Sequence, residues 1–276
     1  MSAPLLDLAV AAKHFQDVQV LEDISFHLQD GEVVSLVGAS GCGKSTLLRI
    51  VAGLDRQYSG SASVLGEPIQ RHSRHVGFIF QEPRLLPWLT VAQNVGFELG
   101  RRGADHPRVK ALLAEVGLAD YAHAYPKQLS GGMAQRASIA RGLFNQPELL
   151  LLDEPFSAVD AFTKMRLQDL LLNVAAHHGT TLLLVTHDID EAVYLSNRVL
   201  VMASKPGRIS GEVAVDLPRQ RDRPNPRLAE LKAQVLNLLN GGVGDCRDVF
   251  AEAEEAARQR QFHWQPINLE TFAFAL

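Results

Sequence analysis

The sequence predicts an α/β fold whose sheet is largely parallel in its centre, because buried strand-like segments alternate with helical ones. The clearest helix is expected at 162–177, where leucine and valine recur on one face. That face consists of Leu167, Leu170, Leu171 and Val174. The expected strands, in chain order, are 32–37, 75–80, 149–152, 181–185 and 198–202.

The N-terminal half contains two further signals. Residues 18–37 predict a hairpin, with a turn at 29–31, that leads into a buried strand. Residues from about 82 to 145 contain no strand-like run, so we expect an inserted helical subdomain there.

The C-terminal part is expected to be a separate linker and tail. A segment rich in proline and arginine at 217–226 is typical of a linker, and helices are expected at 228–238 and 252–261. We therefore predict a main domain at 1–215 and a linker with a helical tail at 216–276. Residues 241–276 are either a docking or regulatory tail or a packed C-terminal extension.

Composition excludes several classes of protein. With 46% hydrophobic and 21% charged residues among 276, the chain can bury a substantial core. No uninterrupted apolar run approaches the ~18 residues of a membrane span, and the N-terminus lacks a secretory signal, so a cytoplasmic start is expected. A net charge of −4 predicts no nucleic-acid partner. Cys42 and Cys246 stand too far apart to indicate zinc or a disulfide framework.

A phosphate-binding loop is predicted at 38–46, which matches G-x-x-x-x-G-K-[ST] after an expected strand and before an expected helix. Its backbone N–H groups would point at phosphate oxygens. Lys44 is expected to bridge the β- and γ-phosphates, and Ser45 to ligate Mg²⁺. The alternative is a glycine-rich turn with an incidental lysine. The predicted nucleotide-binding residues here are Gly38, Ala39, Ser40, Gly41, Cys42, Gly43, Lys44, Ser45 and Thr46.

Two carboxylates end the strand at 149–152. Asp153 suits a direct or indirect Mg²⁺ contact, and Glu154 suits the base that polarises an attacking water. An apolar run that ends in Asp-Glu is common and by itself is a weak signal. Together with the phosphate loop it strongly indicates a nucleotide site.

A second anion-binding helix start is predicted at Ser130, Gly131 and Gly132. A single chain can hardly direct both the phosphate loop and this helix start at one nucleotide. We therefore expect a head-to-tail pair of chains, in which each chain completes the other's site. By itself, the same segment could be an ordinary helix cap.

Together, these motifs resemble the ATP-binding subunit of ABC transporters over roughly residues 5–215. The resemblance implies a P-loop NTPase (RecA-like) core with a mostly parallel sheet, an N-terminal antiparallel β subdomain and an inserted α-helical subdomain. It implies ATP and Mg²⁺ as cofactors. The signature departs from the commonest pattern at Met133 and Ala134, which affects side-chain contacts and not the backbone N–H groups.

The resemblance also assigns roles. Phe15 matches the ring that stacks on adenine, and Gln81 matches a catalytic glutamine that also contacts Mg²⁺. His187 matches the switch histidine at the γ-phosphate, and Ser157 and Asp160 match the loop at the dimer interface. The alternatives are a core position for Phe15, a polar strand end for Gln81 and a helix cap for His187.

Segments 81–95, 160–169, 186–194 and 204–208 resemble the importers of nitrate, sulfonates and taurine. This implies a peripheral subunit on the cytoplasmic face of the cell (inner) membrane. Its partners would be a second copy or a homologous ATPase subunit, an integral membrane permease and, indirectly, an extracytoplasmic solute-binding protein.

Three apolar residues after Gln81 are candidates for the permease-docking groove, or else for the subdomain core. They are Leu85, Leu86 and Trp88. A soluble cassette acting on DNA or ribosomes would need a long coiled coil or a second phosphate loop, and the sequence has neither. A non-catalytic regulatory cassette would lack Glu154 or His187, and both are present. An importer ATPase for another solute remains an alternative.

Overall fold

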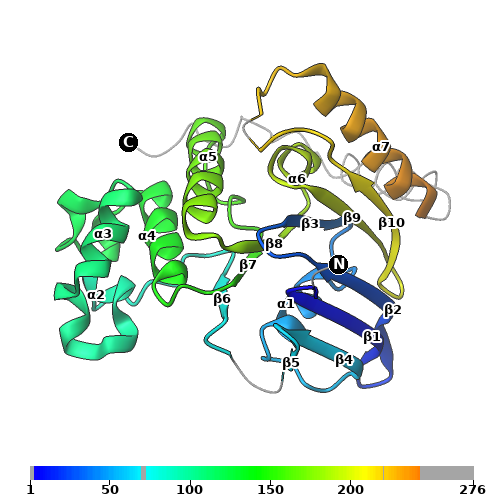
Figure 1. The fold of residues 1–276 in the computed structure, drawn as a ribbon, viewed down its shortest axis with the longest axis horizontal. Helices are drawn as coiled ribbons and strands as arrows, with labels where there is room; N and C mark the ends of the chain where they lie inside the picture. Colours follow the sequence, from blue (N-terminus) through cyan, green and yellow to red (C-terminus); the bar gives the residue numbers. More distant parts are fainter. Residues whose placement is uncertain (1–2, 70–72, 220, 243–276) are drawn as a thin grey trace, which may run out of the picture. The chain divides into compact units, whose positions relative to one another are not determined.

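The computed structural model describes residues 3–69, 73–219 and 221–242, and it contains two sheets with helices around the larger one (Figure 1). The smaller, sheet A, has the strand order β2-β1-β4-β5, and the larger, sheet B, has the order β10-β9-β3-β8-β7-β6. The predicted fold class, including the N-terminal antiparallel part and the helical insertion, is confirmed.

Sheet A is antiparallel throughout. Its strands are β1 (Leu6–Phe15), β2 (Val18–Leu28), β4 (Ser59–Val64) and the short β5 (Glu67–Pro68). Buried and exposed residues alternate along β1, as expected of a sheet covered on one face.

Sheet B is parallel from β9 to β6, and only β10 runs antiparallel at its edge. Its strands are β3 (Val33–Gly38), β6 (Val76–Ile79), β7 (Leu149–Asp153), β8 (Thr181–Thr186), β9 (Arg198–Ala203) and β10 (Arg208–Ala214). All five strands expected from the sequence are present, so the prediction of a sheet parallel in its centre is confirmed.

The hairpin predicted at 18–37 is wrong. β2 pairs with β1 in sheet A, whereas β3 pairs with β8 and β9 in sheet B, so the turn between them joins two sheets. The N–H of Glu32 donates to the carbonyl of Gln29 at 3.1 Å in this turn. Every residue of β3 is buried, which requires neighbours on both edges and cover on both faces, while β2 is partly exposed.

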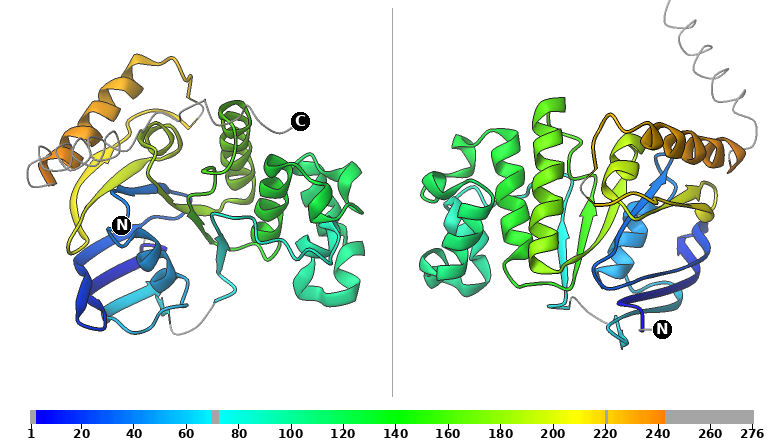
Figure 2. Two further views of the ribbon diagram at one scale, coloured as in Figure 1. Left: turned by 180° about the vertical axis from the view of Figure 1, so that it is seen from behind. Right: turned by 45° about the horizontal axis from the view of Figure 1, so that its top comes forward.

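The helices are α1 (Lys44–Val51), α2 (Val91–Val95), α3 (Pro107–Glu115), α4 (Gly131–Leu143), α5 (Ala161–His178), α6 (Ile189–Leu195) and α7 (Pro226–Gly242). Short 3-10 helices lie at Phe97–Asp105, Ala119–Tyr121 and Pro126–Gln128. Segment 82–145 contains helices and no strand, as predicted, and Figure 2 shows α2, α3 and α4 grouped beside sheet B.

Alternate residues along the strands of sheet B face two different hydrophobic clusters, one on each side of the sheet. Leu149 and Leu151 face the cluster that also holds α1 and sheet A, whereas Leu150 and Leu152 face the cluster of α4 and α5. Both faces are therefore covered, and this holds the carboxyl ends of the parallel strands in one line.

Helix α7 packs against the edge of sheet B through Leu231 and Val235, which are buried with Val213 of β10. The division at residue 215 stays a prediction, and the helix expected at 252–261 lies outside the described residues. Among the described residues, no helix combines the length and apolar character that crossing a bilayer requires.

Candidate functional site

Four predicted site segments follow neighbouring parallel strands. The phosphate loop follows β3, His187 follows β8, Glu154 follows β7 and Gln81 follows β6. Carboxyl ends of parallel strands meet at one edge of a sheet, which is the usual place for a ligand in such folds. The structure thus brings together residues that are up to 149 positions apart, counting from Gly38 to His187.

The phosphate loop curls around the ammonium group of Lys44. Its Nζ donates to the carbonyl oxygens of Gly38 at 2.8 Å and Ala39 at 3.0 Å. Gly43 has a φ of +99°, and a Cβ there would lie 2.4 Å from a methyl carbon of Leu21. Only glycine fits at this position, which lets the loop enter α1 closely.

The start of α1 meets the requirements of an anion site. No side chain caps the helix, and its first turn contains no acidic residue. The N-terminal N–H groups therefore lack a side-chain acceptor, and the helix dipole adds positive charge there. Together with Lys44, which is only 6% exposed, these groups suit the phosphates of a nucleotide.

Ser45 and Asp153 form an oxygen pair beside the loop, with the Ser45 hydroxyl donating to Asp153 Oδ1 at 2.9 Å. Burial raises the pKa of Asp153 above its usual value, although the Ser45 hydrogen bond opposes the shift. Hydroxyl and carboxylate oxygens are what Mg²⁺ prefers, and a cation there would favour the charged form of this half-buried carboxylate. These residues fit a magnesium ion.

Glu154 faces His187, with His187 Nδ1 lying 3.0 Å from Glu154 Oε2. Glu154 has a φ of +46°, in the left-handed region that a non-glycine residue seldom adopts. Its N–H donates to Val185 O at 2.8 Å, so the strained residue is held by the adjoining strand β8. The side chain of His187 is 64% exposed, and Asp188, not His187, caps the following helix. The helix-cap alternative for His187 is therefore wrong.

Gln81 lies two residues beyond β6 and is exposed. Its position at the same edge as Asp153 is compatible with either a metal contact or a polar strand end. No hydrogen bond of its side chain in the described structure decides between these two.

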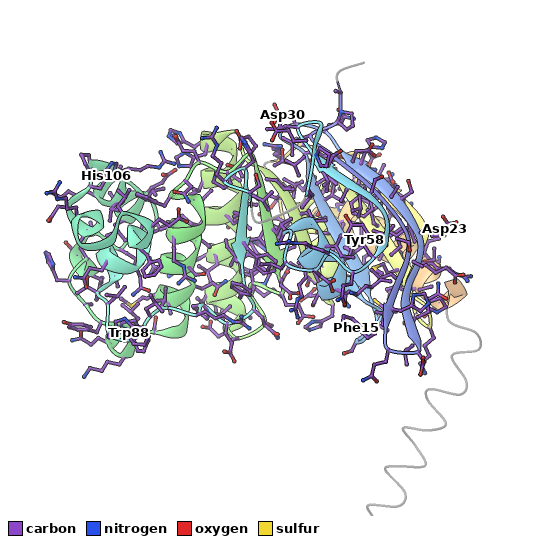
Figure 3. All side chains as sticks on the ribbon, turned by 90° about the horizontal axis from the view of Figure 1, so that it is seen from below. Phe15, Asp23, Asp30, Tyr58, Trp88 and His106 are labelled. Atoms are coloured by element: carbon purple, nitrogen blue, oxygen red, sulfur yellow. The ribbon has the colours of Figure 1, made fainter. Side chains whose placement is uncertain are left out.

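Phe15 ends β1 and is 50% exposed, so the core alternative for this residue is wrong. Lys13 Nζ lies 4.5 Å from the ring centroid, and it is also bound to Asp55 Oδ1 at 2.7 Å. The buried lysine thus supports one face of the ring, and Figure 3 shows Phe15 at the side of sheet A.

Ser130, Gly131 and Gly132 open α4, as predicted, and the Ser130 hydroxyl accepts from the N–H of Met133 at 3.3 Å. A Cβ on Gly132 would lie 2.5 Å from a methyl carbon of Thr163, so glycine lets α4 begin against α5. In Figure 1, α4 lies with α2 and α3, on the side of β6, and α1 lies next to sheet A. The two helix starts therefore belong to different parts of the chain.

The predicted interface residues connect β7 to α5. Ser157 donates to the carbonyl of Glu154 from its N–H at 3.2 Å and from its hydroxyl at 3.0 Å. Asp160 is the N-cap of α5, with its carboxylate accepting from the N–H groups of Phe162 and Thr163.

Sequence reasoning missed a set of charges next to this segment. Lys164, Asp188 and Glu191 form a bridge between α5 and α6, with Lys164 Nζ at 2.6 Å from Asp188 Oδ2 and 2.8 Å from Glu191 Oε2. Asp188 and Glu191 are three residues apart at a helix start, which indicates one face, but no local signal pairs them with Lys164.

The candidate docking residues separate into different environments. A groove of ≈ 480 Å³ between sheet B and the helical segment includes Leu86, Phe78 and Phe97 in its lining. Leu85 packs against the core of α2, α3 and α4 instead. Trp88 is 69% exposed and is not a core residue, and Figure 3 shows it beside these helices.

Comparison with known proteins agrees with a nucleotide-binding site at this sheet edge. A family model described as ABC transporter matches residues 21–157. The chain is 56% identical over 239 residues to the aliphatic sulfonates import ATP-binding protein SsuB 2 of Burkholderia cenocepacia, covering 87% of this chain and 88% of that protein. It is 59% identical over 239 residues to SsuB 1 of Pseudomonas syringae pv. syringae, covering 87% and 98%.

A third relative, SsuB 1 of Xanthomonas axonopodis pv. citri, is 60% identical over 228 residues, covering 81% of this chain and 90% of that protein. A solved structure of a dimeric ATP-binding cassette in a post-hydrolysis state with ADP and phosphate has a TM-score of 0.66 and 29% identity. The match covers 77% of this chain and 100% of the chain in that structure. With these identities over most of the relatives' length, the chain belongs to the ABC transporter family as an ATP-binding, ATP-hydrolysing subunit.

Proposed function

We propose that this chain energises the import of aliphatic sulfonates through a membrane permease by hydrolysing ATP in a head-to-tail dimer. The observation that carries the proposal is the convergence, at one sheet edge, of the Lys44 loop, the Ser45–Asp153 pair and the Glu154–His187 pair. An anion-binding loop, a cation-binding oxygen pair and a base with its partner are the parts that phosphoryl transfer to water needs.

Within one chain, each residue has a defined task in this proposal. The loop N–H groups and Lys44 bind the β- and γ-phosphates, Phe15 stacks on the adenine, and Ser45, Asp153 and Gln81 hold Mg²⁺. A magnesium ion held by these residues would neutralise phosphate charge. Glu154 accepts the proton of the attacking water, and His187, whose Nδ1 lies 3.0 Å from Glu154 Oε2, contacts the γ-phosphate.

The second chain completes the site. The start of α4, with Ser130, Gly131 and Gly132, would bind the γ-phosphate held by the partner's Lys44 loop, and Ser157 and Asp160 would lie at the interface. The solved relative with ADP and phosphate is dimeric, which supports this arrangement. The two anion-binding helix starts in one chain belong to separate parts of the fold, and a pair of chains uses both.

The solute and the partners are proposed from the relatives, which are named for aliphatic sulfonate import. Transport requires an integral membrane permease, on whose cytoplasmic side the chain would be held, and a solute-binding protein outside the membrane would deliver the sulfonate. Nitrate and taurine are the alternative solutes.

The test is reconstitution of the chain with its permease and binding protein in liposomes. ATP hydrolysis should rise severalfold with an unsubstituted alkanesulfonate, and not with nitrate or with taurine, which is an amino-substituted ethanesulfonate. Stimulation by nitrate alone would overturn the assignment of the solute. If neither membrane partner bound the chain and its ATPase were independent of both, a soluble non-transport cassette would be the better description.

Trp88 gives a separate test of permease docking. Trp88→Ala should weaken association with the permease by roughly thirtyfold, because truncation of a central aromatic anchor costs about 2 kcal/mol. Basal ATP hydrolysis and the melting temperature should stay at the parental values, since the side chain is 69% exposed and lies away from the phosphate loop. Binding to permease liposomes and solute-stimulated hydrolysis are the measurements.

The matched control for this variant is Tyr121→Ala, which removes another exposed aromatic side chain from the same helical segment. It should leave permease binding unchanged. Equal losses in both variants, or an undiminished affinity of Trp88→Ala, would contradict the docking role of Trp88.

A further inference from the structure

Lys164 joins two segments of the site that lie far apart in the sequence. It lies in the first turn of α5, where its backbone N–H donates to the carbonyl of Asp160 at 2.8 Å. Its Nζ reaches α6 and lies 2.6 Å from Asp188 Oδ2 and 2.8 Å from Glu191 Oε2. One side chain therefore connects the helix that follows 157–160 with the helix that follows His187.

The contact with Asp188 bears directly on the backbone of His187. Asp188 is the N-cap of α6, and its Oδ1 accepts from the N–H of Glu191 at 3.1 Å. The N–H of Asp188 donates to Thr186 Oγ1 at 3.0 Å, so both neighbours of His187 are held. The imidazole itself is 64% exposed, and its Nδ1 lies 3.0 Å from Glu154 Oε2. The position of the imidazole therefore depends on the backbone at 186–188, which is fixed by the Lys164–Asp188 contact and by the N-cap of α6.

These contacts form a ring that the backbone of 157–160 closes. Glu154 contacts His187, the next residue Asp188 contacts Lys164, the N–H of Lys164 bonds to Asp160, and Ser157 bonds back to the carbonyl of Glu154. The ring surrounds a cavity of ≈ 140 Å³. A displacement of 157–160 therefore reaches His187 by two routes, one through Glu154 and one through Lys164.

Burial shows that this bridge is more than an exposed ion pair. Glu191 is 3% exposed, and Lys164 is 21% exposed. Burial raises the pKa of Glu191, while for Lys164 burial is outweighed by the hydrogen bonds to both carboxylates, which raise its pKa. A buried ion pair of this kind adds little net stability relative to apolar residues, so a role in defining geometry accounts for it better.

We propose that Lys164 is a positioning residue that transmits the docking of a second copy on 157–160 to His187, so that the imidazole stays aligned with Glu154 for ATP hydrolysis. This inference rests on the proposed function, because the second copy is part of that proposal. It assigns Lys164 no contact with the nucleotide, and the effect of the residue should therefore appear in turnover and not in ATP binding.

The test uses a variant that leaves no unpaired buried carboxylate. In Lys164→Met combined with Glu191→Gln, kcat should fall on the order of 10- to 100-fold, as expected when reacting groups are misplaced by about 1 Å. The KM for ATP, the dissociation constant of ATP on dilute monomer and the melting temperature should remain near the parental values. The single variant Lys164→Arg keeps a charged donor at the same place, so it should retain most of the parental turnover.

The matched control is Lys232→Met. It removes another lysine from an ion pair with α6, because Lys232 Nζ lies 2.6 Å from Asp190 Oδ2, but it reaches that helix from α7. Its kcat should equal that of the parent chain.

Three results would overturn the positioning role while the parent hydrolyses ATP normally. They are a parental kcat in the double variant, a loss expressed in KM or melting temperature together with kcat, and an equal loss in Lys232→Met. A parent chain that neither hydrolyses ATP nor dimerises with it would instead overturn the proposed function, and the role of Lys164 with it.

Discussion

Replacing Glu154 by Gln is expected to lower kcat for ATP hydrolysis on the order of 10²–10⁴-fold, the usual contribution of a general base. The amide keeps the shape of the side chain and cannot accept the proton of the attacking water. The phosphate loop and the Ser45–Asp153 pair are untouched, so ATP with Mg²⁺ should accumulate a stable dimer. Steady-state hydrolysis and size-exclusion chromatography with ATP measure the two effects.

The chain offers a close control for this substitution at the other end of β7. Glu148 directly precedes that strand, and His75 Nδ1 lies 3.0 Å from Glu148 Oε2, the same separation as between His187 and Glu154. Glu148→Gln should therefore keep the parental kcat. A monomeric Glu154→Gln variant at saturating ATP, or one that hydrolyses ATP at the parental rate, would contradict the assignment of the base and of the composite site.

Lys44→Ala should weaken ATP binding to the isolated monomer roughly ten- to hundredfold, because it removes a charged hydrogen-bond donor whose contribution is about 1.5–3 kcal/mol. Ser130→Arg should leave monomer affinity nearly unchanged and prevent the ATP-dependent dimer, since the added side chain would occupy the place of the partner's phosphate. Nucleotide binding on dilute protein and dimer formation at high concentration separate the two half-sites.

Ser130 also caps α4, so its replacement needs a control for stability. Ser130→Ala loses the cap, at a cost of about 1 kcal/mol, without adding bulk. It should still dimerise, with a lowered melting temperature. If Lys44→Ala and Ser130→Arg lost monomer affinity equally, the division of labour between the two helix starts would be wrong.

Local sequence patterns predicted most of the elements that carry the site. Five of the six strands of sheet B were predictable because each is a short apolar run, and α5 because its apolar residues recur at helical spacing. The edge strand β10 is not an apolar run, and it was not expected from the sequence. The loop at 38–46 was predictable because a backbone that wraps phosphate needs glycine at defined positions, such as Gly43 with its φ of +99°. These features depend on neighbours along the chain, which a sequence displays directly.

The failures concern pairing between distant segments. The turn at 29–31 is consistent with a hairpin, and only the position of β3 between β8 and β9 shows that it joins two sheets. Phe15, Leu85 and Trp88 could each have been core or surface residues from their type alone. Their exposure depends on which other elements cover them, and that is a property of the packed fold.

By itself, the sequence determined the chemistry available to this protein: the lysine loop, the Asp153–Glu154 pair, the serine-capped helix of α4 and their order along the chain. Tertiary structure alone decided that His187 lies 3.0 Å from Glu154 and that Lys164 pairs with Asp188 and Glu191. The reason is physical. Glycine turns, caps and apolar periodicity act over a few residues. The ion pair between Lys164 and Asp188, which are 24 positions apart, forms only after the sheet has brought the starts of α5 and α6 to the same edge.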